Sequence, residues 1–372
     1  MGVLLHPARP WDLRPGDDGP APPDPGAWPE VGVVIPARNE SDAIAPTLAA
    51  LDRQDYPGAM RVVVVDERSS DGTGQVTRVA ARAASRRVQV VTGAALPDGW
   101  VGKVWGMEQG VRALESGGSA PPWVLLTDAD IHHAPDSLRR LVAAAVAGGT
   151  GLESRMARLR CQSPAEKLLI PPFVLFFFLL YPPRWANRAG SRVASAAGGC
   201  NLVRHDALRG AGGFAAVSDA LIDDLAVARL VKFRAGMPTR LALSRGRVTS
   251  TRPYDDLASV WTMVRRSAFT QLRRSWALVV LVALALLLMF AGPIAALVAG
   301  GIGITMGAVP MGAWALGLGL AGWLAMAVAA GPATRAFGLA WAWRLALPVA
   351  GLLYGAMTVD SALRGPRGGG WR

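Results

Sequence analysis

The feature that most constrains this chain is a long apolar stretch that carries almost no charge. Between Trp276 and Met357 the only charged side chains are Arg335 and Arg344. Because a helix needs about 20 apolar residues to cross a bilayer, we expect three transmembrane helices, at about 277–298, 309–330 and 337–358. Most of the charge lies before this stretch, so a second region must fold in water.

The sequence on either side of this stretch indicates how it is oriented. Residues 256–275 repeat apolar side chains at helical spacing with arginines between them, which predicts an amphipathic helix on the membrane surface. Arginines just before Trp276 indicate the cytoplasmic side. The basic tail, residues 359–372, would prefer the same side, which requires an even number of spans. Either residues 291–330 contain a fourth crossing or the tail departs from this rule.

Strand and helix patterns alternate after residue 30. Short β-branched runs at 31–35, 61–65, 88–92 and 123–127 are typical of buried strands, and helical patterns follow them. This alternation predicts an α/β domain with a mostly parallel sheet, over residues 31–255. Residues 1–30 are rich in Pro, Gly and Asp without periodicity, and we expect them to be disordered.

A shorter apolar segment, residues 168–183, interrupts this domain. Its apolar run is too short to span a bilayer and contains Pro171 and Pro172. A single crossing here would also place the acidic residues before and after it on opposite sides of the membrane. One active site needs them together, so we expect an interfacial or re-entrant segment, with a buried core helix as the alternative.

Acidic residues directly follow two of the predicted strands. Asp66 directly follows one strand, and Asp128-Ala129-Asp130 directly follows another. Ligands bind at the carboxyl ends of strands in such sheets, so these acids are expected on one rim. Two carboxylates flanking one small residue can hold Mg²⁺ or Mn²⁺ together with a diphosphate. Asp128 and Asp130 are therefore the predicted metal ligands.

Four segments together resemble glycosyltransferase family 2, the inverting enzymes with the GT-A fold. They read VVIPARNE, VVDERSSDGT, GKVWGMEQG and TDAD, in that order. Three later segments are similar to the hopanoid-biosynthesis-associated branch of that family: AGGCNLVRHDALRGAGGF, LIDDLAVARLVK and RPYDDLASVWTMVRRSAFTQLRRS. The resemblance implies a GT-A domain followed by an all-α bundle of transmembrane helices.

The resemblance also implies roles for individual residues. Asp224, or less favourably Asp223, would be the general base that takes the proton of the acceptor hydroxyl. Gln271 and Arg274 match part of a Q-x-x-R-W motif on the acceptor or diphosphate side, although Trp276 comes one residue later than in that motif. Residues that would bind the donor are Pro36, Arg38, Glu40, Asp66, Lys103 and Asp128.

These patterns predict a membrane-bound, metal-dependent glycosyltransferase in the inner membrane, with its catalytic domain in the cytoplasm. It would move sugar from a nucleotide diphosphate sugar, a UDP-sugar by resemblance, to a lipid acceptor, by resemblance a hopanoid. Alternative acceptors are polyprenyl phosphate and a glycerolipid or sphingolipid, and the alternative from another class is a non-catalytic membrane scaffold. The net charge of +12 is attributed to the membrane surface, because no basic stripe interleaved with aromatics suggests nucleic-acid binding.

Overall fold

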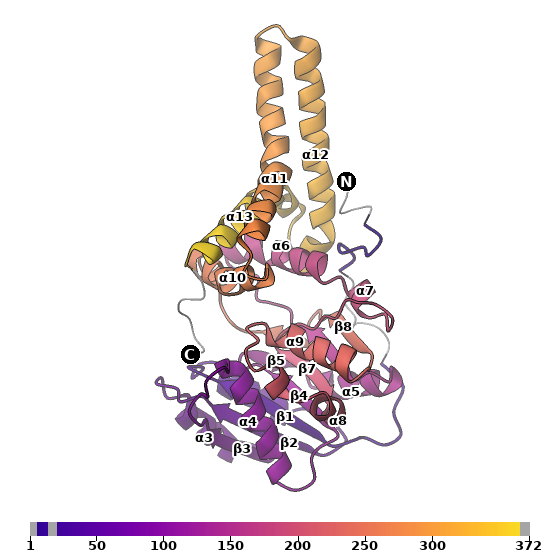
Figure 1. Ribbon diagram of the computed structural model, residues 1–372, viewed down its shortest axis with the longest axis vertical. Helices are drawn as coiled ribbons and strands as arrows, with labels where there is room; N and C mark the ends of the chain where they lie inside the picture. Colours follow the sequence, from indigo (N-terminus) through magenta and orange to yellow (C-terminus); the bar gives the residue numbers. More distant parts are fainter. Residues whose placement is uncertain (1–5, 14–20, 365–372) are drawn as a thin grey trace. The chain divides into compact units, whose positions relative to one another are not determined.

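The computed structural model describes residues 6–13 and 21–364, which fall into two compact units (Figure 1). The sheet unit comprises residues 21–160 and 181–252, and the helical unit comprises residues 6–13, 161–180 and 253–364. The helical unit therefore takes a segment out of the middle of the sheet unit's sequence. Each unit is described separately below.

The sheet unit is built around a seven-stranded sheet of order β3-β2-β1-β4-β7-β6-β8. All neighbouring strands are parallel except β7, which is antiparallel to both β4 and β6. The predicted mostly parallel α/β fold is confirmed. The strands are β1 (Val31–Ala37), β2 (Met60–Asp66), β3 (Val88–Thr92), β4 (Trp123–Thr127), β6 (Leu152–Met156), β7 (Cys200–Arg204) and β8 (Thr239–Leu243).

Helices cover both faces of this sheet, as the continuously apolar strands require. Helices α2 (Ile44–Asp52), α3 (Thr73–Ala83) and α5 (Ser137–Ala147) pack on one face. Helices α4 (Gly102–Ser116), α8 (His205–Gly210) and α9 (Asp223–Arg229) pack on the other. A Cβ added at Gly110 of α4 would lie 2.3 Å from Val34 Cγ1, so the glycine allows α4 to approach β1 closely.

A small second sheet holds the segment that follows β4. Strand β5 (Ile131–His133) pairs antiparallel with β9 (Val248–Ser250), with Ile131 opposite Ser250. This pairing brings the end of the sheet unit's sequence next to Asp130. Helix α7 (Pro183–Ala186) and the 3₁₀ turn η1 (Phe214–Val217) lie in longer connections, and a π-helical turn, η2 (Leu230–Arg234), continues α9.

The helical unit consists of α6 (Pro164–Leu180), α10 (Leu257–Gln271), α11 (Trp276–Thr305), α12 (Val309–Ala336) and α13 (Leu347–Arg364), with a 3₁₀ turn, η3 (Trp341–Ala346). Figure 1 shows α11 and α12 side by side, while α6, α10 and α13 gather at one end of this pair. An apolar cluster joins these three helices through Leu169, Val260, Val264 and Tyr354.

Among the described residues, four helical segments are long and apolar enough to cross a membrane: 164–186, 276–305, 309–336 and 341–364. Segment 164–186 is longer than its apolar run indicated, because α6 begins at Pro164 and the segment also includes α7. Residues 291–330 contain the second half of α11 and most of α12, joined by a short turn, and no additional helix within this described range. The third span, expected at 337–358, begins later because Gly338 has a left-handed φ of 70° and ends the preceding helix. Helix α13 continues to Arg364, into the predicted tail, whose last residues lie outside the described ones.

The described part of the predicted disordered N-terminus, residues 6–13 and 21–30, forms turns and extended segments without a helix or strand. Trp28 nevertheless packs edge-to-face against Tyr56, with ring centroids 5.5 Å apart. The prediction of disorder for residues 1–30 stays a prediction.

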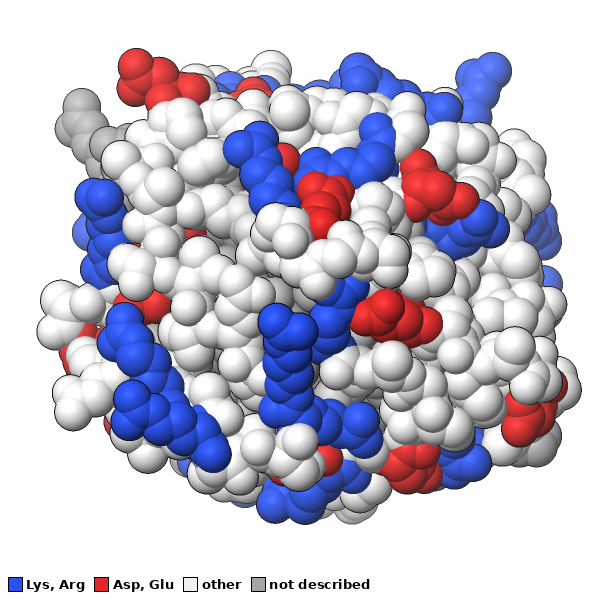
Figure 2. Space-filling view, turned by 90° about the horizontal axis from the view of Figure 1, so that it is seen from below, with Lys and Arg blue, Asp and Glu red and all other residues white. Residues whose placement is uncertain are grey.

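Basic and acidic side chains are interspersed on the face of the molecule shown in Figure 2. Arginine and lysine groups there are separated by uncharged surface and by acidic groups. On this face the basic groups therefore do not form one continuous patch.

Candidate active site

A small pocket lies where β4 ends, and it contains five of the residues singled out in the sequence: Pro36, Lys103, Asp128, Asp223 and Asp224. Three local features bring them together. Strands β1 and β4 are parallel neighbours, so the residues that follow them share one rim. Helices α4 and α9 begin at this rim, with Lys103 and Asp223 in their first turns.

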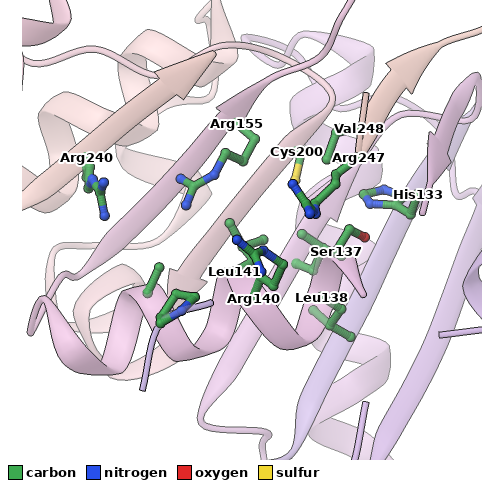
Figure 3. Close-up of a pocket in the computed structure, with 13 residues that line it drawn as sticks. His133, Ser137, Leu138, Arg140, Leu141, Arg155, Cys200, Arg240, Arg247 and Val248 are labelled. Atoms are coloured by element: carbon green, nitrogen blue, oxygen red, sulfur yellow. The ribbon is translucent and has the colours of Figure 1, made fainter. Parts of the chain in front are cut away.

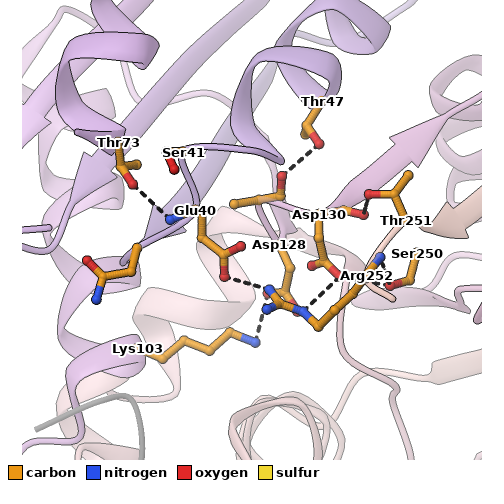
Figure 4. Close-up of polar contacts among 12 residues, drawn as sticks. Glu40, Ser41, Thr47, Thr73, Lys103, Asp128, Asp130, Ser250, Thr251 and Arg252 are labelled. Atoms are coloured by element: carbon orange, nitrogen blue, oxygen red, sulfur yellow. Dashed lines mark hydrogen bonds and ion pairs between the residues drawn. The ribbon is translucent and has the colours of Figure 1, made fainter. Parts of the chain in front are cut away.

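Lys103 links the acidic residues of the pocket (Figure 4). Its Nζ lies 2.8 Å from Asp128 Oδ1, the contact that the figure draws. The same Nζ lies 3.3 Å from Asp223 Oδ2. Burial alone would lower the pKa of Lys103, but the surrounding carboxylates outweigh it and raise that pKa. Lys103 is therefore a fixed positive charge between two segments that are far apart in the sequence.

Asp224 is the most strongly perturbed acid in the pocket. Burial, and then the neighbouring charge of Asp223, raise the pKa of Asp224 to about 7, against the opposing effect of Lys103. One oxygen, Oδ1, accepts a hydrogen bond of 2.8 Å from the Leu225 amide, which holds the carboxylate at the start of α9. A carboxylate with a pKa near neutrality can exchange a proton with a substrate hydroxyl.

Asp130 belongs to a neighbouring cluster (Figure 4). Its Oδ2 accepts hydrogen bonds from Ser250 Oγ at 2.7 Å and from Arg252 Nε at 3.3 Å. Arg252 also donates from Nη2 to Glu40 Oε1 at 2.5 Å. Burial raises the pKa of Glu40 despite the opposing effect of Arg252. The two carboxylates of the Asp128-Ala129-Asp130 motif therefore contact different cationic side chains.

The oxygen atoms around Gly198 fit the chemistry of a hard divalent cation. Asp128 Oδ2 and Asp224 Oδ2 lie 3.8 and 3.7 Å from the position that a Cβ of Gly198 would take. Asn201 Oδ1, in the same pocket, is buried without a hydrogen-bond partner. Within residues 6–13 and 21–364, no three His, Cys, Asp or Glu side chains form a complete metal cage. A cation here would therefore need phosphate oxygens as further ligands.

Two predicted donor-binding residues share the rim without lining the pocket. Asp66 ends β2, in register with Ala37 of β1, and its Oδ1 accepts a hydrogen bond of 3.0 Å from the Ser69 amide. Arg38 follows β1 and stabilises the charged form of the neighbouring Glu67. Burial nevertheless raises the pKa of Glu67 to about 7.

The predicted acceptor-side residues belong to the helical unit. Gln271 is the last residue of α10, and Arg274 follows in a left-handed conformation with φ 55°. Trp276 begins α11 and its ring packs 5.9 Å from that of Phe269.

The sequence did not single out two residues that the structure places at the site. Asn201 lies in the AGGCNLVRHD segment and Arg252 opens the RPYDDL segment, both within the resemblance. Asn201 reaches the pocket because β7 pairs with β4, with Asn201 opposite Leu126. A strand pairing of this kind cannot be recognised from one sequence.

A second cavity, of about 230 Å³, lies between α5 and the sheet and contains no predicted site residue (Figure 3). Four arginines line it, and they share two carboxylates. Arg155 Nη1 lies 2.6 Å from Glu153 Oε1, and Arg247 Nε lies 3.0 Å from Asp136 Oδ2. The other two are Arg140 and Arg240.

The family model described as "Glycosyltransferase like family 2" matches residues 29–270, more than half of the chain. The chain belongs to glycosyltransferase family 2. Among solved structures, it is similar to the mannosyltransferase PcManGT from Pyrobaculum calidifontis in complex with GDP-Man and Mn²⁺. That likeness has 19% identity and a TM-score of 0.53, over 96% of this chain and 92% of the other, and it shows a shared fold.

Other solved structures match a smaller part of the chain. Glucosyl-3-phosphoglycerate synthase from Mycobacterium tuberculosis, in complex with Mg²⁺ and UDP, has 16% identity and a TM-score of 0.40, over 65% of this chain and 79% of the other. TarS 1-349 from S. aureus, in complex with UDP, has 16% identity and a TM-score of 0.38, over 64% of each chain.

Proposed function

We propose that this family 2 chain is a membrane-bound inverting glycosyltransferase that moves a sugar from a nucleotide diphosphate sugar to a hydroxyl group of a lipid. The observation that carries the proposal is the convergence of Lys103, Asp128 and Asp224 in one pocket at the carboxyl end of β4. Family membership supports sugar transfer, and the complexes of similar proteins with GDP-Man or UDP support a nucleotide-linked donor.

In the proposed reaction the acceptor oxygen attacks the anomeric carbon as the bond from that carbon to the diphosphate breaks. Asp224 takes the acceptor's proton, which its raised pKa suits. Lys103 offsets charge on the departing nucleoside diphosphate. When bound, Mg²⁺ or Mn²⁺ would supply further charge stabilisation for that leaving group. Asp128 would hold the cation, and Asn201 Oδ1 lies in the same pocket. Asp130 remains the second proposed metal ligand, and Arg252 would hold its carboxylate in place.

The remaining predicted donor residues would act around the nucleotide. Pro36 lines the pocket, while Arg38 and Asp66 lie along the same rim and could reach the base or ribose. Glu40 would act indirectly, because its carboxylate is bound by Arg252. Gln271 and Arg274 remain proposed contacts on the acceptor or diphosphate side.

The order of the two units along the sequence favours a membrane location with few crossings. Residues 161–180 interrupt the sheet unit, so a single crossing by α6 would place the halves of one folded sheet on opposite sides of the membrane. Helix α6 therefore enters and leaves on one side in this proposal. This is the interfacial or re-entrant arrangement expected for residues 168–183.

Helix α13 also fits a position in the interface. Tyr354 Oη donates to the Leu169 carbonyl of α6, and Asp360 Oδ2 accepts from Trp261 Nε1 of α10, each at 2.8 Å. In their most apolar windows, 50% of the α6 segment and 56% of the α13 segment are buried, against 11% for α11 and 22% for α12. We therefore propose that α11 and α12 alone cross. Two crossings return the basic tail to the cytoplasmic side. This proposal therefore satisfies the even number of spans that the basic tail requires.

A hopanoid remains the proposed acceptor on the sequence resemblance alone. The test is to incubate the purified full chain, in lipid nanodiscs with Mn²⁺, with radiolabelled UDP- and GDP-sugars and a hopanoid-containing lipid extract. Labelled hopanoid is the expected product. Labelled polyprenyl phosphate, glycerolipid or sphingolipid would instead identify that lipid as the acceptor. Failure of the chain to bind any sugar nucleotide in the presence of Mn²⁺ would favour a non-catalytic scaffold.

A further inference from the structure

Two guanidinium groups of the helical unit converge on one glycine. Arg335 lies in the last turn of α12, and Arg344 lies in η3, after the chain reverses at Gly338. A Cβ added at Gly331 would lie 3.6 Å from Arg335 Nη1 and 3.7 Å from Arg344 Nη1. Both cations are thus held close together at one end of an otherwise apolar helix.

A narrow groove lies next to these arginines, between α6, α12 and the start of α13. Its apolar wall includes Pro171, Leu175 and Trp343, and Lys167 adds a third cation to its lining. Thr334 also lines the groove, and its Oγ1 accepts a hydrogen bond of 3.3 Å from Arg344 Nε. The groove therefore combines an apolar wall with a cationic rim.

No carboxylate neutralises this rim within the described ranges, 6–13 and 21–364. Asp360 pairs with Arg265 and Arg364, and Glu166 accepts hydrogen bonds from backbone amides, among them that of Ser163. Neither acid forms an ion pair with Lys167, Arg335 or Arg344. Cations placed only to mark the cytoplasmic end of a helix would spread into solvent and headgroups, whereas these two arginines are directed toward the same point.

We propose that this groove binds the anionic phosphate headgroup of a membrane phospholipid, with Arg335, Arg344 and Lys167 around the phosphate. One acyl chain would lie along the apolar wall at Pro171 and Leu175. Converging arginines match phosphate oxygens in charge and geometry, and basic pockets between membrane helices suit such headgroups. The inference uses the membrane location proposed above, and it does not depend on sugar transfer.

The test is native mass spectrometry of the full chain released from detergent micelles and titrated with phosphatidylglycerol or with phosphatidylcholine of the same acyl chains. We expect tighter binding of phosphatidylglycerol, and a weakening on the order of 10- to 30-fold in the Arg335→Gln/Arg344→Gln double variant. The Arg335→Lys/Arg344→Lys variant keeps the charge but loses the guanidinium geometry, and it should bind with an affinity between those of the native chain and the glutamine variant. Arg266→Gln, which removes an exposed arginine of α10, is the matched control and should change nothing.

Each outcome decides the proposal. Equal binding of the two lipids, or equal loss in the Arg266→Gln control, would overturn it. Displacement of the lipid by an equal concentration of inorganic phosphate would assign the site to free phosphate instead. If the glutamine variant melts at a lower temperature, the lysine variant still separates charge from folding. Sugar transfer without lipid preference would contradict only this inference, and lipid preference without transfer would contradict only the proposed function.

Discussion

The cations at the pocket of the sheet unit and the two converging arginines of the helical unit differ in how their charge is balanced. In the sheet unit, Lys103 contacts Asp128 and Asp223, and Arg252 contacts Glu40 and Asp130. In the helical unit, Arg335 and Arg344 converge on Gly331, and Arg344 donates a hydrogen bond to the hydroxyl of Thr334. The difference indicates where each unit receives its counter-charge.

In the sheet unit the counter-charges are built into the protein and hold the pocket in shape before any ligand binds. A donor diphosphate with its cation would then exchange partners with Lys103 and Asp128 without a large change in net charge. In the helical unit the bilayer itself can supply anionic groups. Under the two proposals, charge at the catalytic site is balanced within the chain, whereas the charge of Arg335 and Arg344 is balanced by lipid.

The largest effect is expected from Asp224→Asn, which removes the proposed base. We expect turnover to fall by about 10²- to 10⁴-fold. The base acts only when unprotonated, and its pKa is raised to about 7, so kcat/KM of the native protein should decline as the pH drops through about 7. A pH–rate profile in a lipid-nanodisc assay measures both. Asp223→Asn is the comparison. If turnover falls further in Asp223→Asn than in Asp224→Asn, and if the decline of kcat/KM at low pH disappears, Asp223 is the base.

The next largest effect is expected from Asp128→Asn, which leaves Lys103 with one carboxylate fewer and removes the proposed metal ligand. Turnover should fall by about 10²-fold, with a higher Mn²⁺ concentration needed for half-maximal rate. The matched control is Asp206→Asn, an exposed acid near the opposite end of β4, where β7 pairs in reverse. Similar rates in the two variants would remove Asp128 from the mechanism.

A smaller effect is expected from Arg252→Gln. This change deprives both Glu40 and Asp130 of a charged hydrogen-bond donor. Hydrogen bonds of this kind stabilise a protein by about 1.5–3 kcal/mol each when they are shielded from solvent, and by less at a half-exposed site such as this one. We expect the donor KM to rise about tenfold with a smaller change in kcat. Arg252→Lys should recover part of the loss, and an unchanged KM in both variants would argue against a positioning role.

The smallest effect is expected in the helical unit, from Gly312→Ala. An added Cβ would lie 2.7 Å from Ile304 Cγ1 and 2.8 Å from the Gly300 carbonyl, so α11 and α12 would have to move apart. The cost should be about 1–3 kcal/mol of stability, seen as a lower melting temperature in detergent. A Cβ added at Gly317 in the same helix has no atom within 4 Å, so Gly317→Ala should be neutral or stabilising. The same fall in melting temperature in both variants would contradict close packing of α11 against α12 at Gly312.

Local sequence patterns predicted the sheet unit well because its strands are short, apolar runs bounded by polar residues. Strands β3 and β4 begin and end where the sequence indicated, and Asp66 and Asp128 occupy equivalent strand ends. The convergence of Asp223 and Asp224 on Asp128 followed only from the family resemblance, since α9 reaches the pocket through tertiary packing. The partners of Asp130 depend on β5 pairing with β9, which no local pattern reveals.

The helical unit was harder to predict because apolar composition alone does not separate a crossing helix from one packed against its neighbours. Helix α13 has the composition of a span, yet Asp360, Ser361 and Tyr354 bind α10 and α6. The start of this helix also depended on Gly338, whose left-handed backbone ends α12. Hydropathy responds to neither feature.

The most direct test of the central claim is calorimetric titration of the purified full chain with UDP and with GDP, in Mn²⁺ and in EDTA. The claim is that Asp128, Lys103 and their neighbours form one metal-assisted nucleotide diphosphate site. We predict that one of the nucleotides binds in Mn²⁺, that EDTA abolishes binding, and that Asp128→Asn weakens it while Asp206→Asn does not. Nucleotide binding that is equally strong in EDTA and in the Asp128→Asn variant would contradict the account.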